Sequence, residues 1–176
     1  GLNQAASQKC ACPAGMYSGA GASACSTAGE GEYTVDANTN PISSAAVGVA
    51  TASEGYYTVD TNNAATSTGA VDYVRAPTGY YTVDTNGAAI SSGAVAISIA
   101  QEGYYTIDTD GGATSQGAVN QMIAPAGKYT FNSSGAVTSG AVDVEDAPKG
   151  AYTVDSNNQP TTSLAVDIAY ADTGSY

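Results

Sequence analysis

The sequence contains no histidine, no tryptophan and a single phenylalanine. Without histidine, Ser-His-Asp and Cys-His catalysis and imidazole metal sites are excluded. The glycines follow a repeat rather than a phosphate-binding pattern, so no P-loop or dinucleotide fingerprint is present. No apolar run approaches the ~20 residues that a membrane-spanning helix needs. We therefore expect a chain that is not an enzyme, has no organic cofactor and does not span a membrane.

Basic residues are also scarce. Lys and Arg together number 4 against 16 Asp and Glu, which gives a net charge of −12. Such a chain is repelled by nucleic acid and by anionic membrane surfaces, so neither is expected as a partner. Charged residues make up only 11% of the sequence, well below the ~25% of ordinary soluble domains. A weakly charged chain rich in Gly, Ser, Thr and Tyr is typical of extracellular structural proteins, and we expect secretion to the cell surface.

What the sequence does contain is a tandem repeat. Residues 79–87 read Gly-Tyr-Tyr-Thr-Val-Asp-Thr-Asn-Gly, and related copies start 24 residues apart, except that the fifth copy is 23 residues long. Equivalent positions in a repeat have equivalent surroundings, so the invariant tyrosine predicts a ladder of tyrosines along one axis. The copies begin at Gly31, Gly55, Gly79, Gly103, Gly127 and Gly150, and the ladder is Tyr33, Tyr57, Tyr81, Tyr105, Tyr129 and Tyr152.

Each copy predicts three short β-strands, which in the third copy are residues 80–84, 88–91 and 94–99. Side chains alternate in the first strand, and residues 84–87 have the composition of a tight turn. No helical periodicity is present. We expect an all-β fold, a β-solenoid of six to seven rungs with three short strands per rung. A linear array of small β-hairpin modules is the alternative.

The repeat also sets the expected domain organisation. Residues 1–9 are either a tail or an assembly arm that pairs with a neighbouring molecule. Residues 10–30 form an atypical, cysteine-containing capping repeat, residues 31–173 form six tandem repeats, and residues 174–176 start a truncated seventh repeat. The sequence begins with Gly1 instead of an initiator methionine. It is either a fragment of a longer chain or a mature chain whose signal peptide has been removed, and we expect the second.

Residues 10–25 read Cys-Ala-Cys-Pro-Ala-Gly-Met-Tyr-Ser-Gly-Ala-Gly-Ala-Ser-Ala-Cys. This short segment resembles the Cys-Pro-Ala-Gly-x-Tyr-Ser repeats of ephrin-receptor-like, cysteine-rich extracellular proteins of protists and algae. The resemblance implies disulfides, secretion and an elongated modular rod. The second cysteine pair of that module is missing here after Cys25. Later repeats carry Ala-Pro-x-Gly in place of Cys12-Pro13-Ala14-Gly15, so the segment matches a shortened zeroth copy that caps the array.

Three cysteines leave one without a partner in the same chain. Cys12 and Cys25 would close a short loop, and Cys10 with Cys25 is equally compatible with the sequence. The remaining thiol, Cys10 in the first case, either forms an intermolecular disulfide or stays buried or capped.

Aspartate recurs at the sixth position of the repeat, and residues 108–111 read Asp-Thr-Asp-Gly. This spacing is similar to that of calcium loops with oxygen ligands, which makes Asp84, Asp108 and Asp110 weak calcium candidates. The alternative is an Asx turn, in which the carboxylate accepts a backbone N–H. We favour the turn because no distal glutamate completes a calcium loop.

Asn132-Ser133-Ser134 is an N-glycosylation sequon in the turn of the fifth copy, and the many hydroxyl groups are further acceptors for covalently attached glycans. Together these features predict an extracellular structural protein, the self-assembling subunit of a filament, surface hair or cell coat, with itself as partner in a head-to-tail homopolymer. The alternative is an adhesin-like or calcium-dependent carbohydrate-binding module on a stalk.

Overall fold

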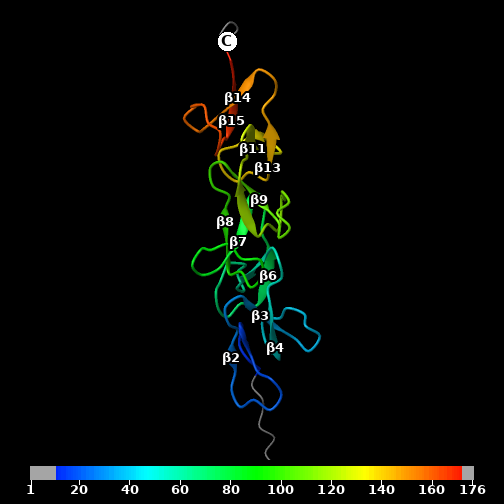
Figure 1. Ribbon diagram of the computed structural model, residues 1–176. Helices are drawn as coiled ribbons and strands as arrows, with labels where there is room; N and C mark the ends of the chain where they lie inside the picture. Colours follow the sequence, from blue (N-terminus) through cyan, green and yellow to red (C-terminus); the bar gives the residue numbers. More distant parts are fainter. Residues whose placement is uncertain (1–10, 172–176) are drawn as a thin grey trace, which may run out of the picture.

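The computed structural model describes residues 11–171, which form an all-β rod. Short hairpins follow one another along the long axis, so the chain runs from one end of the rod to the other (Figure 1). The strands are β1 (Met16–Tyr17), β2 (Ser26–Thr27), β3 (Glu32–Val35), β4 (Gly48–Thr51), β5 (Tyr56–Val59), β6 (Asp72–Arg75), β7 (Tyr80–Val83), β8 (Ala96–Ile99), β9 (Tyr104–Ile107), β10 (Asn120–Ile123), β11 (Lys128–Asn132), β12 (Gly135–Ala136), β13 (Asp143–Asp146), β14 (Ala151–Val154) and β15 (Asp167–Tyr170). The all-β prediction is confirmed.

Each full repeat is built on one antiparallel hairpin. In the third repeat β7 pairs with β8, with Tyr80 opposite Ile99 and Val83 opposite Ala96. The same pairing joins β3 to β4, β5 to β6, β9 to β10, β11 to β13 and β14 to β15, and the shorter β1 and β2 form a hairpin in the cysteine-containing segment. The sheets are therefore small and separate, each confined to one repeat.

The expected middle strand is reduced to a single bridge in most repeats. In the third repeat this bridge joins Val83 to Ala89, and the backbone N–H of Ile90 then donates to the carbonyl of Thr82. Beyond Ile90 the chain turns away from its own hairpin towards the preceding repeat. The predicted run of three strands per rung is thus two strands and a bridge.

The fifth repeat is the exception because its turn is one residue shorter. Asn132 pairs directly with Gly135 across the two residues Ser133 and Ser134, so β11 extends to Asn132 and β12 can form. The result is the one three-stranded sheet in residues 11–171, in the order β12-β11-β13.

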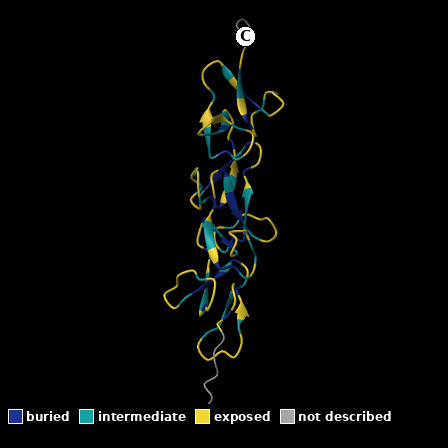
Figure 2. Cartoon of the chain, turned by 180° about the vertical axis from the view of Figure 1, so that it is seen from behind, coloured by how far each residue is buried: buried dark blue, intermediate teal, exposed yellow. Residues whose placement is uncertain are grey.

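Buried residues lie along the centre of the rod, and the exposed turns project sideways (Figure 2). The core is made of small and medium side chains: alanines, valines, tyrosines and the invariant threonines. Ala52, Ala76 and Ala100 are fully buried at the connections between repeats, where a larger side chain would push neighbouring repeats apart. The predicted arm at residues 1–9, Cys10 and the truncated copy at residues 174–176 lie outside the described residues.

Candidate assembly interface

Repeats are joined by a two-residue segment that follows a bend made mostly of Ser and Thr, which in the third repeat is Ser91-Ser92. We call it the link segment; in the third repeat it is Gly93-Ala94. Its members are Ala45-Ala46, Gly69-Ala70, Gly93-Ala94, Gly117-Ala118, Gly140-Ala141 and Leu164-Ala165. The first residue of every link segment has positive φ, between 56° and 67°. This left-handed residue turns the chain out of its own hairpin and onto the preceding repeat, which explains why glycine is commonest there.

The link segment makes backbone hydrogen bonds to the two repeats before it, the first residue to the end of the repeat two before and the alanine to the repeat just before. The N–H of Gly93 donates to the carbonyl of Ala52 (2.8 Å), and the carbonyl of Ala94 accepts from the N–H of Thr58 (3.0 Å). Ala94 also forms a parallel bridge with Tyr57. Equivalent bonds recur at successive junctions, starting with Ala45 and Ala46 against the cysteine-containing segment. Neighbouring repeats are therefore held mainly by backbone groups, which every sequence variant of the repeat can supply.

The invariant threonine completes this junction. Thr82 has 0% exposure, and its hydroxyl donates to the carbonyl of Ile90 in its own repeat (2.6 Å) with a longer contact to Ala118 of the next (3.4 Å). A buried hydroxyl without a partner would be costly, and here the partner is the carbonyl at which the chain leaves the hairpin. The sequence showed the invariance of this threonine but not its role. The remaining members of the set are Thr34, Thr58, Thr106, Thr130 and Thr153.

A second set of contacts packs the start of one repeat against the repeat two further along the chain. The first glycine of a copy packs against the link segment two repeats later: a methyl group on Gly79 would lie 2.4 Å from the carbonyl oxygen of Gly140. Gly31 and Gly93 have the same relation, with a distance of 2.1 Å. The copy-initiating glycine is thus needed for close approach as well as for its positive φ.

Polar side chains also join copies that are two or three apart along the chain. The hydroxyl of Thr85 donates to Glu30 Oε1 (2.8 Å), and that of Thr109 donates to Glu54 Oε1 (2.6 Å). Arg75 donates to the carbonyl of Gln116 (3.2 Å). These bonds are exposed, and exposed polar pairs contribute little individually. They fix how the repeats align with one another more than they stabilise the rod.

The predicted tyrosine ladder takes a different form. Each tyrosine of β3, β5, β7 and β9 bridges to the alanine of the next link segment, rather than to another tyrosine of the ladder. The aromatic pairs found in residues 11–171 join Tyr73 to Tyr33 and to Tyr56. Ala70 and Ala118 are fully buried and pack in the same clusters as Tyr33 and Tyr81, so a larger side chain has no room at these bridges. Tyr33, Tyr81 and Tyr105 are buried; Tyr57 and Tyr129 are half-buried.

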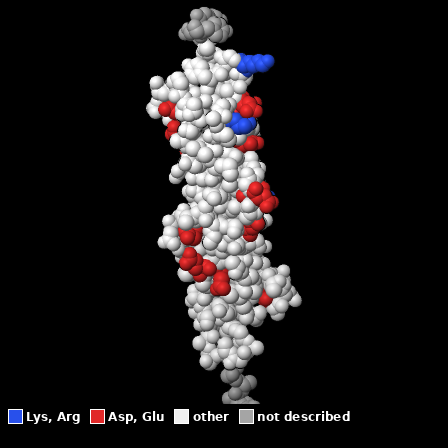
Figure 3. All heavy atoms as spheres, in the orientation of Figure 1, with Lys and Arg blue, Asp and Glu red and all other residues white. Residues whose placement is uncertain are grey.

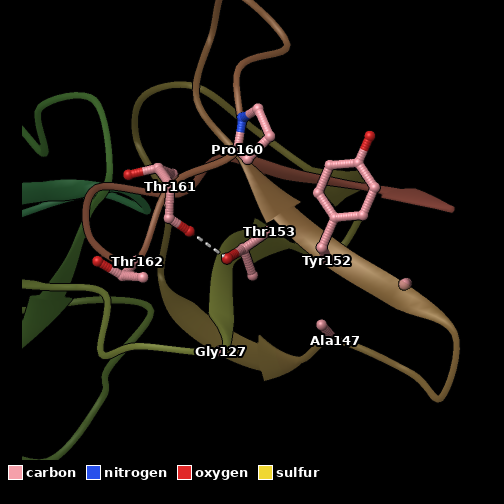
Figure 4. Close-up of a pocket in the computed structure, with 8 residues that line it drawn as sticks. Gly127, Ala147, Tyr152, Thr153, Pro160, Thr161 and Thr162 are labelled. Atoms are coloured by element: carbon pink, nitrogen blue, oxygen red, sulfur yellow. Dashed lines mark hydrogen bonds between the residues drawn. The ribbon is translucent and has the colours of Figure 1, made fainter. Parts of the chain in front are cut away.

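At the last repeat, no residue among 11–171 covers this contact surface. Tyr152 is 41% exposed where Tyr81 is 6%, and Thr153 is 7% exposed where its counterparts are 0%. A groove of about 610 Å³ lies here, lined by Gly127, Ala147, Ala151, Tyr152, Thr153, Pro160, Thr161 and Thr162 (Figure 4). At the junctions inside the rod, the residues equivalent to Gly127, Ala147 and Thr153 are those that touch a link segment.

The recurrent aspartate forms an Asx turn. Asp84 Oδ1 accepts from the N–H groups of Asn86 (2.8 Å) and Ala88 (2.9 Å), and these bonds, that from Ala88 first, lower the pKa of the Asp84 carboxyl. Asp108 Oδ1 accepts in the same way from Asp110 and Gly112. No group of three or more metal-ligating side chains is found between residues 11 and 171. Calcium binding at Asp84, Asp108 and Asp110 stays a prediction.

Two further predicted sites, the cysteines and Asn132, lie in different repeats of the rod. Cys12 and Cys25 form a disulfide with a Cα–Cα distance of 5.7 Å, which chooses between the two pairings left open by the sequence. Asn132 ends β11, where its Oδ1 accepts from the N–H of Ser134 (2.8 Å). Asn132 itself is half-buried and the turn residues Ser133 and Ser134 are exposed, and glycosylation of Asn132 stays a prediction.

Comparison with protein-family models, curated proteins and solved structures finds no match to this chain. Among residues 11–171, no helix has the length and apolar character needed to cross a membrane. The architecture of the junctions is consequently the main guide to function.

Proposed function

We propose that this chain is an extracellular structural protein, the self-assembling subunit of a filament, surface hair or cell coat. The observation that carries the proposal is the way the repeats interlock. Each of the first four repeats contacts the link segments of the next two repeats, whereas the fifth and sixth repeats together line a groove of the same construction that no described link segment occupies. A rod whose end repeats its own internal contact surface is suited to head-to-tail addition.

The chemistry of the rod supports an extracellular setting. The Cys12–Cys25 bond is of the kind that persists in oxidising compartments. The face seen in Figure 3 is mostly uncharged, with acidic groups in separate patches along the rod. Such a surface suits close lateral neighbours or attached glycans. We include an N-linked glycan on Asn132 in the proposal, and intact mass before and after enzymatic deglycosylation tests it.

In the assembled fibre the stacked hairpins would continue across subunit boundaries as one β-solenoid. Every rung would then have link segments on both sides, which the last repeat of a single chain lacks. The proposal assigns no catalysis to the chain, since its recurrent residues serve the junctions.

Electron microscopy and sedimentation velocity of the purified full chain test the proposal. We expect fibres whose width is that of the rod, with a proportion of assembled protein that rises with concentration. A matched preparation kept at low concentration serves as the control and should contain single rods. Single rods at every concentration, up to the solubility limit, would contradict a structural role through self-assembly.

A second candidate function is calcium-dependent carbohydrate binding, as in an adhesin-like module on a stalk. It is favoured by the row of exposed Asx turns, in which Asp108 Oδ1 accepts two amides while Asp110 is exposed next to it. Thermal unfolding with calcium chloride and with a chelator tests it. If calcium ligates these carboxylates, the melting temperature rises with calcium, and Asp110→Asn reduces the rise. Equal melting temperatures would remove this candidate.

A further inference from the structure

We propose that the groove at the C-terminal end of the rod binds residues 2–12 of a second copy of the chain, with Ala5-Ala6 as an additional link segment. The inference rests on the proposed assembly and specifies its contact. It is drawn from the repeat register that the structure defines and from the contacts that recur at each internal junction.

The register comes from the spacing between the link segment and the buried alanine that follows it. The alanine of the link segment precedes that buried alanine by six residues, as Ala46 precedes Ala52 and Ala94 precedes Ala100. Cys12 occupies the position of this buried alanine, because its carbonyl accepts from the N–H of Ala45 as that of Ala52 accepts from Gly93. Counting six residues back from Cys12 gives Ala6.

The residues around Ala6 match a link segment. Ala5-Ala6 is identical to Ala45-Ala46, whose first residue takes the left-handed conformation without being glycine (φ 56°). Leu2 occupies the position of Ile42 and Ile90, the apolar residues four positions before the link. Ser7 differs from the pattern, since valine follows the alanine of the link segment in the six described repeats. Residues 2–12 thus match the second half of a repeat.

The groove offers the complementary groups. At five internal junctions the threonine N–H donates to the link alanine, and at five the carbonyl equivalent to that of Ala147 accepts from the first link residue. Thr153 N–H and Ala147 C=O have no such partner within residues 11–171. Ala5-Ala6 of a second copy would supply both, with the N–H of Ala5 donating to Ala147 and the carbonyl of Ala6 accepting from Thr153.

Gly127 completes the fit. Gly79 and Gly103 abut the link segments two repeats later, Gly140 and Leu164, and a methyl group on either would lie within 2.4 Å of them. Gly127 has φ +77°, as Gly79 does, but nothing lies within 4 Å of the position of its absent methyl group. This open space is where the link segment of the next copy would lie.

Three full-length variants test the contact. Gly127→Ala places a methyl group in the space reserved for Ala5, and Ala6→Leu enlarges the side chain that must lie buried at the bridge to Tyr152. Gly87→Ala is the matched control, because Gly87 has φ +78° and open space but lies in a side turn. Sedimentation velocity and electron microscopy measure assembly, and thermal unfolding of dilute protein confirms that each variant folds.

We expect the wild type and Gly87→Ala to assemble alike. Gly127→Ala and Ala6→Leu should each need at least about fivefold more protein for half-assembly, which corresponds to the loss of two hydrogen bonds at roughly 0.5–1.5 kcal/mol each. Hydrogen exchange should also show protection of the Thr153 amide in wild-type assemblies.

Each other outcome overturns the inference in a recognisable way. If the wild type forms fibres and both test variants do so equally well, the chain assembles through a different surface, and the proposed function stands without this contact. If only Ala6→Leu is impaired, the N-terminal segment binds outside the groove. A wild type that never assembles overturns the contact and the proposed function together.

Discussion

Replacing Gly79 with alanine measures directly how much the two-repeat contact stabilises the rod. Gly79 has φ +77°, and a methyl group there would lie 2.4 Å from the carbonyl oxygen of Gly140. Two effects add. Alanine in the left-handed region costs about 1–2 kcal/mol relative to glycine, and forcing an extra carbon into a filled site costs about 1–3 kcal/mol more. The contacting atom is backbone carbonyl, which cannot move aside as a flexible side chain would.

Two glycines of the same chain separate these effects. Gly127 has the same φ of +77° and the same position in its repeat, and Gly87 has φ +78° in the hairpin of Gly79 itself. Neither has an atom within 4 Å of the added carbon, so alanine at either site costs only the backbone strain. The free energy of unfolding of Gly79→Ala should therefore lie about 1–3 kcal/mol below that of both controls.

The assay is urea and thermal unfolding of dilute, unassembled protein, followed by circular dichroism and tyrosine fluorescence. For a chain of this length 1 kcal/mol shifts the melting temperature by about 2–4 °C, so Gly79→Ala should melt about 2–12 °C below the controls. Gly127 lies near the end of the rod, where local opening can hide part of its effect. Gly87 removes that ambiguity. Equal melting temperatures for Gly79→Ala and Gly87→Ala would refute the claim that repeats two apart are in close contact.

The remaining predictions concern single junction or surface groups. Thr82→Val leaves the carbonyl of Ile90 without its donor and should cost about 1–3 kcal/mol in urea unfolding, whereas Thr82→Ser keeps the hydroxyl and should cost about 1 kcal/mol; equal losses would contradict the role of the hydroxyl. Reduction of the Cys12–Cys25 bond, which spans 13 residues, should destabilise the N-terminal hairpin by roughly 3 kcal/mol, seen as faster hydrogen exchange there and not in later repeats. The hydrogen bond from the Tyr129 hydroxyl to Glu145 raises the pKa of Tyr129 to about 12. The raised pKa stabilises the fold below the ordinary tyrosine pKa of 10.0, and this contribution disappears as the pH rises from there through about 12. Burial also raises the pKa of Tyr33, so an ultraviolet titration should show late tyrosine ionisation, of which the Tyr129 part moves to lower pH in Glu145→Gln; an unchanged titration would contradict the assignment.

The repeat, the strands and the turns were predictable because each leaves a local signal. Residues 80–83 alternate and are strand formers, and they form β7 as predicted. Asp84 followed by Asn86 and Gly87 predicted an Asx turn, and the structure contains it. The third strand was placed too early: it was predicted to begin at Ala94, whereas β8 begins at Ala96. Ala94 is taken by the bridge to the preceding repeat, a partner that no local pattern identifies.

The contacts between repeats could not be predicted in the same way. The ladder hypothesis assumed that like residues stack on like, which holds when successive rungs are in register. Here the link segment steps back by one repeat, so Tyr81 meets Ala118 rather than Tyr105. The signal that could have indicated this was the joint invariance of Thr82 and of the link alanine, two small residues with no ladder of their own. These contacts join a backbone N–H of one repeat to a backbone C=O of another. Every residue type except proline carries both groups, so the amino-acid sequence does not mark which of them pair.

The two ends of the described rod differ: a disulfide-tied hairpin lies at one end and an open groove at the other. This difference gives the proposed assembly a direction. At the N-terminal end the hairpin of β1 and β2 has only two residues per strand, and the Cys12–Cys25 bond ties it together. It still receives the link segment of the first full repeat through Cys12 C=O and Ser18 N–H. At the C-terminal end no covalent tie lies within the described residues, and the Thr153 N–H and Ala147 C=O face the open groove of Figure 4. Addition of a second copy would satisfy these groups at the cost of ordering a short segment, as each internal repeat does for the one before it. The same backbone contact would then close each junction within a chain and each junction between chains, so a fibre would grow without requiring any new kind of interface.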